Sequence, residues 1–395
     1  MKFGTVLNDH KGLGPGFDFL RVFLALAIVL THSWMLTGNL WLYGTPLWFT
    51  EYALVPMFFA LSGFLVSGSA MRLSLGNFLI NRGLRIVPAL AVDIAVCALV
   101  IGPIVTTVAL KSYFTHPDFF SYFLNITGYI HYSLPGVFKD HLNTRVNGAL
   151  WTVPYEIFCY VIMSFLMVTK FVKRPLLIAT LTIVILLIGL VAQSTAILAP
   201  LPTIIQKVVK FFFVSRGAQL FVAFLLGILA YQLKDRIPYS WKIFAGCVAI
   251  CALAAIFLKS GETELVRSRF VLIPALTYIT VFIGLTPVPI PKFFKSGDYS
   301  YGIYLYHDPF LQCVINVFPR LSLIPGFGAL FTFLVGIPVV ILFATGSWHW
   351  IEKPILGLRK KFSFVARVRG VADVPTDSVA APLEDQSGAS KASAA

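Results

Sequence analysis

The sequence has few charged residues for its length. Only 12% of its 395 residues are Asp, Glu, Lys or Arg, whereas 58% are apolar. Soluble proteins carry about 25% charged residues, and a globular protein built from this chain would expose large apolar patches. The composition therefore excludes a soluble globular protein and indicates an integral membrane protein.

Acidic residues are scarcer still, with 17 Asp and Glu against 31 Lys and Arg, a formal net charge of +14. In a membrane chain such an excess reflects loops that stay in the cytoplasm and face anionic lipid, rather than nucleic-acid binding. Cysteine is also sparse. The five cysteines all lie in apolar runs, where they behave as small hydrophobic residues, and they imply no disulfide framework: Cys97, Cys159, Cys247, Cys251 and Cys313.

Apolar residues gather into ten runs that could each cross a hydrocarbon core about 30 Å thick. Placing both termini in the cytoplasm puts 21 basic residues in inner segments and 10 in outer segments, as the positive-inside rule requires. The predicted fold class is all-α integral membrane, with about ten transmembrane helices in one bundle and both termini cytoplasmic. The runs are Leu20 to Leu36, Ala53 to Ser69, Ile86 to Leu110, Leu150 to Thr169, Leu176 to Leu198, Gly217 to Leu233, Trp241 to Leu258, Phe270 to Leu285, Tyr299 to Phe318 and Phe327 to Trp350.

The chain divides into three parts. Residues 1–15 are predicted to form an N-terminal cytoplasmic leader, and its glycines at 12, 14 and 16 indicate flexibility because no strand precedes them to form a phosphate loop. Residues 16–358 form the transmembrane domain, and residues 359–395 a basic and then disordered cytoplasmic tail. The longest outer segment, residues 111–149, is called the outer connection below; it is expected at the membrane interface or over the outer mouth of the bundle.

Ionisable residues inside the first span indicate function, because they are costly in a membrane. Arg21 and His32 are eleven residues apart, which is close to three helical turns, so they share one helix face about 16 Å apart. Asp18 lies one turn before Arg21 and can pair with it. The alternative is that Arg21 extends to the membrane surface and His32 bonds a neighbouring helix.

Two later segments carry small or basic residues at helical spacing. Ser62 and Gly63 permit a close approach between helices, and packing is the favoured interpretation there. Arg82 and Arg85 lie one turn apart on one face, and guanidinium groups suit phosphate oxygens. The alternative for this pair is ordinary positive-inside charge.

The other polar groups lie near the fourth and ninth spans. Glu156 aligns with Thr152 and Tyr160 at intervals of four residues. Its carboxylate could act as a base, as a histidine partner or as a ligand for an acceptor hydroxyl. The alternative is a structural ion pair with one of the arginines. Ser300, Tyr304 and His307 share a face, where they suit sugar contacts or bonds between helices. The histidines of the outer connection lack metal-site spacing, so no metal site is expected.

Taken in order, these segments resemble membrane acyltransferase family 3, whose members O-acylate polysaccharides, lipopolysaccharide and Nod factors. The family's Arg-x10-His motif matches Arg21 and His32, and its Arg-x-x-Arg motif matches Arg82 and Arg85. The remaining matches are Phe58 to Leu65, Leu150 to Tyr160, Ser300 to Pro309 and Trp350 to Pro354. The sequence departs from the family pattern at Phe19, Val22, Ile157 and Asp308.

The resemblance implies transfer of an acyl group, most often acetyl, from cytoplasmic acyl-CoA to a hydroxyl of a cell-surface or exported glycan at the bacterial inner membrane. Acyl-CoA is a co-substrate, and no permanently bound cofactor is expected. His32 and Glu156 are the candidate catalytic residues, and Arg21, Arg82 and Arg85 the candidate donor-binding residues. The candidate supporting residues are Asp18, Ser62, Trp151, Tyr160, Ser300, Tyr304 and His307.

Two other classes fit the composition. A glycolipid or polysaccharide transporter, or flippase, would also have many spans with buried polar residues, but no internal repeat supports it. A membrane scaffold without chemistry would make Arg21, His32 and Glu156 individually replaceable.

Overall fold

The structure, a computed structural model, describes residues 1–12, 14–39, 43–192, 195–214, 217–258, 262–295 and 297–358. Within these ranges all regular structure is helical, and the one isolated β-bridge joins Lys2 and Pro238. The predicted all-α class is therefore confirmed. The tail at 359–395, predicted to be basic and then disordered, lies outside the described residues.

Five helical segments are long and apolar enough to cross a membrane. They are α2 (Phe17–Leu36), α3 (Trp48–Ala70), α4 (Leu75–Val96) with a π-helical turn (Cys97–Ile101) and α5 (Gly102–Val105), α8 (Val153–Val168) with a preceding 3-10 turn (Gly148–Thr152), and α18 (Gly328–Ser347) with a π-helical turn (Trp348–Glu352) and α19 (Lys353–Gly357). Shorter apolar stretches lie in α9 (Pro175–Val191), α12 (Ala218–Gln232), α13 (Trp241–Phe257) and α14 (Glu262–Leu285). The chain is thus a multi-pass membrane protein.

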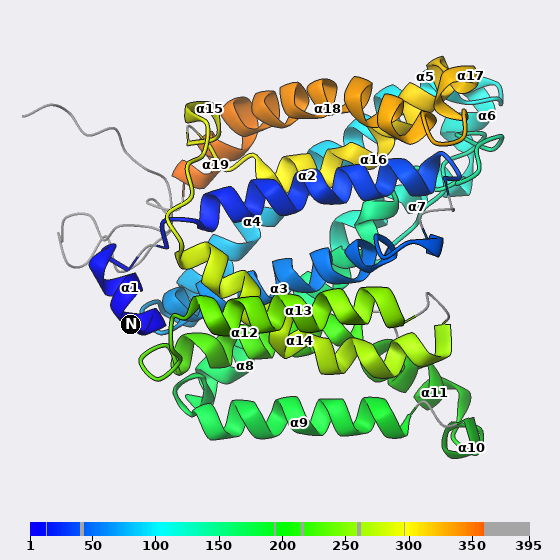
Figure 1. Cartoon of the computed structure of the whole chain (residues 1–395). Coiled ribbons are helices and arrows are strands. Elements are labelled where there is room, and N and C mark those ends of the chain that lie inside the picture. The colour runs from blue at the N-terminus through cyan, green and yellow to red at the C-terminus, as the bar shows by residue number, and fades with distance from the viewer. Residues whose placement is uncertain are drawn as a thin grey trace, which may run out of the picture.

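One further helix, α16 (Ser300–Val317), is mostly buried and carries Ser300, His307 and Asp308 among its buried residues. It packs against α2 and α18, and α2 also contacts α3 and α14, so α2 and α16 lie inside the bundle (Figure 1). Each of the ten predicted runs overlaps one of the helices named so far. The polar residues of α2 and α16 therefore face each other in the interior.

Short helices gather at the two ends of the bundle. Figure 1 shows α15 near α19 at one end, where α1 also lies, and α6 and α17 near α5 at the other end. The short elements are α1 (Phe3–Asp9), α6 (Leu110–Thr115), α7 (Pro117–Tyr122), α10 (Thr195–Leu198), α11 (Thr203–Val209), α15 (Lys292–Lys295), α17 (Pro319–Ser322), the 3-10 turns Phe123–Thr127 and Phe171–Lys173, and the π-helical turn Lys210–Val214.

Helices α3 and α12 pack through glycines. A Cβ atom added at Gly63 would lie 2.1 Å from the carbonyl oxygen of Phe224, and one at Gly227 would lie 2.1 Å from that of Ala60. Only glycine permits so close an approach of two helix backbones. The packing role predicted for Gly63 is therefore confirmed.

The outward faces of the peripheral helices are apolar. Leu176 on α9 is 82% exposed, Leu253 on α13 is 53% exposed and Leu342 on α18 is 75% exposed. A soluble protein rarely exposes so many large apolar side chains, whereas lipid would cover them. This outer surface agrees with the multi-pass assignment.

The described part of the N-terminal leader contains a packed helix, α1, which the sequence analysis did not predict. Phe3 and Leu7 are buried, and the Phe3 N–H donates to the Ile237 carbonyl at 3.0 Å. At the other end of the leader the Gly16 N–H donates to the Gly284 carbonyl at 3.0 Å. Gly14 and Gly16 therefore serve close packing, because a Cβ atom at either would lie within 2.6 Å of a backbone oxygen of α14 or of the residues that follow it. The apolar side chains at helical spacing give α1 a face to bury.

The outer connection folds onto the end of the bundle that holds α5 and α17. The Tyr113 hydroxyl donates to the Ala98 carbonyl at 2.8 Å, and the Gln312 side-chain amide donates to the carbonyls of Asn143 and Arg145 at 2.7 and 3.0 Å. These bonds tie the connection to α4 and α16. They also bring its last residues to the buried centre of α16.

Candidate active site

Most of the predicted site residues line one cavity between α2, α3, α4, α8 and α16, which we call the arginine cavity. Its volume is about 120 Å³. The predicted residues that line it are Arg21, Ser62, Arg82, Arg85, Glu156, Tyr160, Ser300 and Tyr304. The helical spacing of Arg82 and Arg85 therefore does place both on one face, as predicted.

An acidic residue that the sequence reasoning did not single out holds two of these arginines. The Arg85 Nη2 atom lies 2.7 Å from Asp298 Oδ2, and the Arg21 Nη1 atom lies 3.8 Å from the same oxygen. Burial raises the pKa of the Asp298 carboxyl, but Arg85 and Arg21 outweigh burial and hold that pKa below its usual range. Asp298 is therefore an anion that contacts two of the arginines lining the cavity. The predicted partner, Asp18, also contacts Arg21, at 3.5 Å and with a half-exposed side chain, so the predicted pair is present.

Hydroxyl and carboxylate groups line the wall of the cavity formed by α8 and α16. The Tyr160 hydroxyl donates to Glu156 Oε1 at 2.8 Å, which confirms the alignment predicted from their spacing. The hydroxyls of Thr152 and Tyr304 lie 2.8 Å apart and join α16 to the turn before α8. Among the described contacts, Glu156 meets neither His32 nor an arginine as an ion pair, so its predicted role as histidine partner lacks a contact here.

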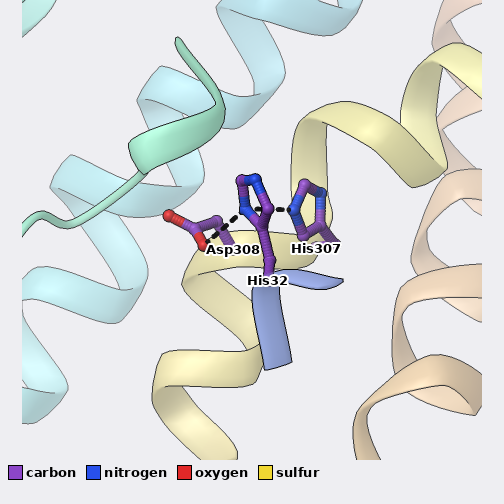
Figure 2. Close-up of side chains that lie close together, drawn as sticks. All are labelled: His32, His307 and Asp308. Atoms are coloured by element: carbon purple, nitrogen blue, oxygen red, sulfur yellow. Dashed lines mark hydrogen bonds and ion pairs between the residues drawn. The ribbon is translucent and has the colours of Figure 1, made fainter. Parts of the chain in front are cut away.

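His32 instead meets two consecutive residues of α16 (Figure 2). Its Nδ1 atom lies 2.9 Å from His307 Nε2 and 3.3 Å from Asp308 Oδ1. His307 is fully buried and Asp308 is 1% exposed, whereas the His32 side chain retains 19% of its exposed area. The second carboxylate oxygen of Asp308 accepts the Gly148 backbone N–H. Asp308 is thus the carboxylate partner of His32, which is one of the roles predicted for Glu156.

The hydrogen bonds decide which nitrogen of each imidazole carries a proton. His307 Nδ1 lies 2.6 Å from the Tyr304 carbonyl oxygen, which can only accept, so Nδ1 is the protonated nitrogen. His307 Nε2 then accepts, and His32 Nδ1 must be the donor at 2.9 Å. The lone pair of a neutral His32 is therefore on Nε2, where it can accept a proton.

His32 and Asp308 line a second cavity of about 240 Å³, which we call the histidine cavity. Trp151, predicted as a supporting residue, lines it together with Glu51 and Arg145. Val55 lines both cavities, so the two spaces adjoin at α3. The arrangement puts a proton acceptor, an aromatic ring and both signs of charge around one space.

The three residues of this cluster also have ligand-type atoms within 4.8 Å of one another, so within the described chain they form a candidate metal site. The expectation of no metal rested on the histidines of the outer connection, and it did not consider residues brought together from α2 and α16. In the structure His32 Nδ1 and His307 Nε2 are 2.9 Å apart and bond each other, so a metal ion that took both of these nitrogens would have to replace that bond.

Asp308 and Asp298 are the functional candidates that the sequence reasoning missed. Asp308 stands next to a candidate histidine inside a nearly uncharged span, and an ionisable residue at such a place indicates function by default. It was noted only as a departure from a family pattern. Asp298 directly precedes the same span, but its distance in sequence from Arg85 hides their contact.

The fold and this cluster define a class: a multi-pass helical membrane protein with a buried histidine, carboxylate and arginine centre. A family model described as an acyltransferase domain, that of acyltransferase family 3, matches residues 15–348. The chain belongs to this family and is a membrane acyltransferase.

Two relatives support the assignment. The chain is 29% identical over 392 residues to nodulation protein 10 of Rhizobium leguminosarum bv. viciae, which covers 92% of this chain and 99% of the relative. It is 26% identical over 343 residues to the O-acetyl transferase of Shigella phage Sf6, which covers 86% of this chain and 95% of the relative. No solved structure matches the chain.

Proposed function

We propose that this protein transfers an acyl group, by preference acetyl, from cytoplasmic acyl-CoA to a hydroxyl of a cell-surface or exported glycan. The observation that carries the proposal is the state of His32: His307 and Asp308 hold its Nδ1–H and leave the Nε2 lone pair for a substrate proton. The family assignment and the name of the phage relative, an O-acetyl transferase, support the reaction type.

The donor would occupy the arginine cavity. Arg21, Arg82 and Arg85 line it, and guanidinium groups form paired, charge-assisted bonds with phosphate oxygens. Asp298 now pairs with two of these arginines, so the phosphates of acyl-CoA would have to share or replace that contact. The acyl end would extend along α2 from Arg21 towards His32, a rise of about 16 Å.

The acceptor would enter the histidine cavity, where the hydroxyl could approach His32. His32 Nε2 takes the proton as the hydroxyl oxygen attacks the thioester carbonyl, the carbon–sulfur bond breaks, and the imidazolium returns the proton to the CoA thiolate. Asp308, 3.3 Å from the ring, stabilises the transient positive charge. In the alternative route His32 Nε2 carries the acyl group itself before the hydroxyl attacks.

The proposal includes the membrane arrangement. Ten spans in one domain at 16–358, after the leader at 1–15, would place both termini in the cytoplasm of a bacterial inner membrane. The distribution of basic residues, 21 inside against 10 outside, favours this orientation. Labelling of single cysteines introduced at positions 10 and 116 in intact cells would test it, because only the second should react with an impermeant maleimide.

The test of function uses purified protein with radiolabelled acetyl-CoA and the envelope glycans of the host bacterium. Replacement of His32 with Ala should abolish transfer, whereas replacement of His116, an exposed histidine of the outer connection, should leave transfer unchanged. Transfer at the wild-type rate by His32→Ala would overturn the proposal. Thermal stabilisation by acetyl-CoA separates the enzyme from a flippase, which has no reason to bind that donor.

A further inference from the structure

Asp93 is an acidic side chain of α4 that the proposed chemistry does not use. It is 1% exposed, and an ionisable residue so deep in a membrane segment is costly unless it has a task. Its carboxylate does not line either substrate cavity; it faces Asn147, near the end of the outer connection.

Asn147 is fully buried, and its side chain is held from three directions. Its Nδ2 atom lies 3.0 and 2.9 Å from the two carboxylate oxygens of Asp93 and 2.9 Å from the Leu305 carbonyl oxygen. Its Oδ1 atom accepts the Ala149 N–H at 2.9 Å. The side chain therefore fixes the outer connection to both α4 and α16 at this residue.

The next residue, Gly148, contacts the catalytic cluster of His32, His307 and Asp308. Its N–H donates to Asp308 Oδ2, while Asp308 Oδ1 lies 3.3 Å from His32 Nδ1. A Cβ atom at position 148 would lie 2.9 Å from Asp308 Oδ2, too close for any other residue without a shift. Contacts therefore run without a gap from Asp93 through Asn147 and Gly148 to Asp308 and His32.

We propose that Asp93 and Asn147 are positioning residues for acyl transfer: they hold the Gly148 N–H against Asp308 and so fix the carboxylate that orients His32. The proposal rests on the proposed function, because it gives Asp308 its task there. If the bonds between Asp93 and Asn147 are lost, the Gly148 N–H loses its fixed direction, and the Asp308 carboxylate can rotate away from His32. A displacement of about 1 Å at a reacting centre can cost a factor of about 100 in rate.

The test is an exchange of the two side chains, measured as kcat and as KM for acetyl-CoA. Asn147→Asp sets two carboxylates against each other and should lower kcat by about 100-fold with KM within about twofold. Asp93→Asn keeps one oxygen that can accept from Asn147 Nδ2 and should therefore lower kcat less than Asn147→Asp does. The double exchange restores an amide opposite a carboxylate and should recover at least about tenfold over Asn147→Asp, although the bond to the Leu305 carbonyl stays lost.

Asn125 offers a matched control. It is fully buried in the same outer connection and donates to the carbonyls of Tyr122 and His131 at 2.8 and 2.9 Å, and its described contacts do not reach the catalytic cluster. Asn125→Asp should lower the melting temperature but leave kcat per folded molecule unchanged. An equal loss of kcat in this control, or no recovery in the double exchange, would overturn the proposal.

A second variant keeps the proposal testable if Asn147→Asp does not fold. Gly148→Ala leaves the bonds of Asn147 intact and pushes on Asp308 alone. Its readout is the rate at which diethyl pyrocarbonate modifies His32 relative to His116, measured by peptide mass spectrometry. A slower reaction at His32 is expected, and an unchanged ratio would overturn the proposal. This readout needs no acyl transfer, so it separates a failure of the positioning role from a failure of the proposed function.

Discussion

Replacement of Asp308 with Asn tests the centre of the proposed chemistry, because it removes one charge and changes the shape very little. The Gly148 N–H needs an acceptor, so the Asn oxygen should turn towards it and the NH2 group towards His32 Nδ1–H. Two donors then face each other where a carboxylate stood. The imidazolium that forms during transfer loses its nearest anion.

The distance sets the size of the effect. Opposite unit charges 3.3 Å apart attract by about 5 kcal/mol at an effective dielectric constant of about 20, a ceiling of nearly four orders of magnitude in rate. Loss of one preorganised charge-stabilising group commonly costs a factor of about 100 to 1,000. We expect a loss in this range, because His307 still accepts the Nδ1–H of His32 and keeps the lone pair on Nε2.

The assay measures CoA thiol release and acetyl incorporation by purified Asp308→Asn protein across a range of acetyl-CoA concentrations. The variant should lose kcat while its KM for acetyl-CoA stays near the wild-type value, since Asp308 lines the histidine cavity and not the arginine cavity. Asp118→Asn, a change of an exposed carboxylate on the outer connection, is the control. A normal kcat in Asp308→Asn, or a loss confined to KM, would refute the reasoning.

Four further outcomes are expected. Arg82→Ala should raise KM for acetyl-CoA at least tenfold and remove thermal stabilisation by that donor. An unchanged KM would mean that Arg82 contributes only to the positive-inside charge. Gly63→Ala should destabilise the protein by about 1–3 kcal/mol, because its Cβ would meet the backbone of α12 at 2.1 Å, whereas Gly246→Ala, with nothing within 4 Å, should not lower the melting temperature. Asp298→Asn should lower the melting temperature at pH 7, and the difference from wild type should shrink below about pH 4. The pKa of the Asp298 carboxyl is lower in the folded protein than in the unfolded chain, so the carboxylate stabilises the fold above its unfolded pKa and loses that contribution in acid. A strong chelator should leave transfer unchanged, because the ring nitrogens of the histidine cluster bond each other; a loss that zinc restores would contradict this arrangement.

Local spacing was sufficient wherever the partners lie on one helix. Arg82 and Arg85 share a face, and Glu156 meets Tyr160, because residues three or four apart on a helix are neighbours in any fold. The glycine contact of α3 was predictable for the same reason, since a small residue in an apolar helix marks a close approach whichever helix supplies the partner.

Spacing was insufficient where the partner comes from elsewhere in the chain. Orienting His32 is one of several roles predicted for Glu156, but the carboxylate that contacts His32 is Asp308, which lies 276 residues away. The predicted pair of Arg21 with Asp18, one turn away on α2, is present at 3.5 Å, but Asp298, the carboxylate that Arg21 shares with Arg85, was not predicted. The helix α1 was not predicted either, because the partners that bury Phe3 lie far along the chain: the Ile237 carbonyl in the α12–α13 loop and the Tyr278 ring on α14.

The sequence by itself determined that this chain lies in a membrane, where its apolar helices run, and which arginines share a face. These properties depend on hydrophobicity and on the 3.6-residue period, which each segment carries alone. The tertiary structure alone decided which nitrogen of His32 keeps its lone pair. That depends on a carbonyl of Tyr304, a ring of His307 and a carboxylate of Asp308 meeting α2, and only the packing of α16 against α2 brings them there.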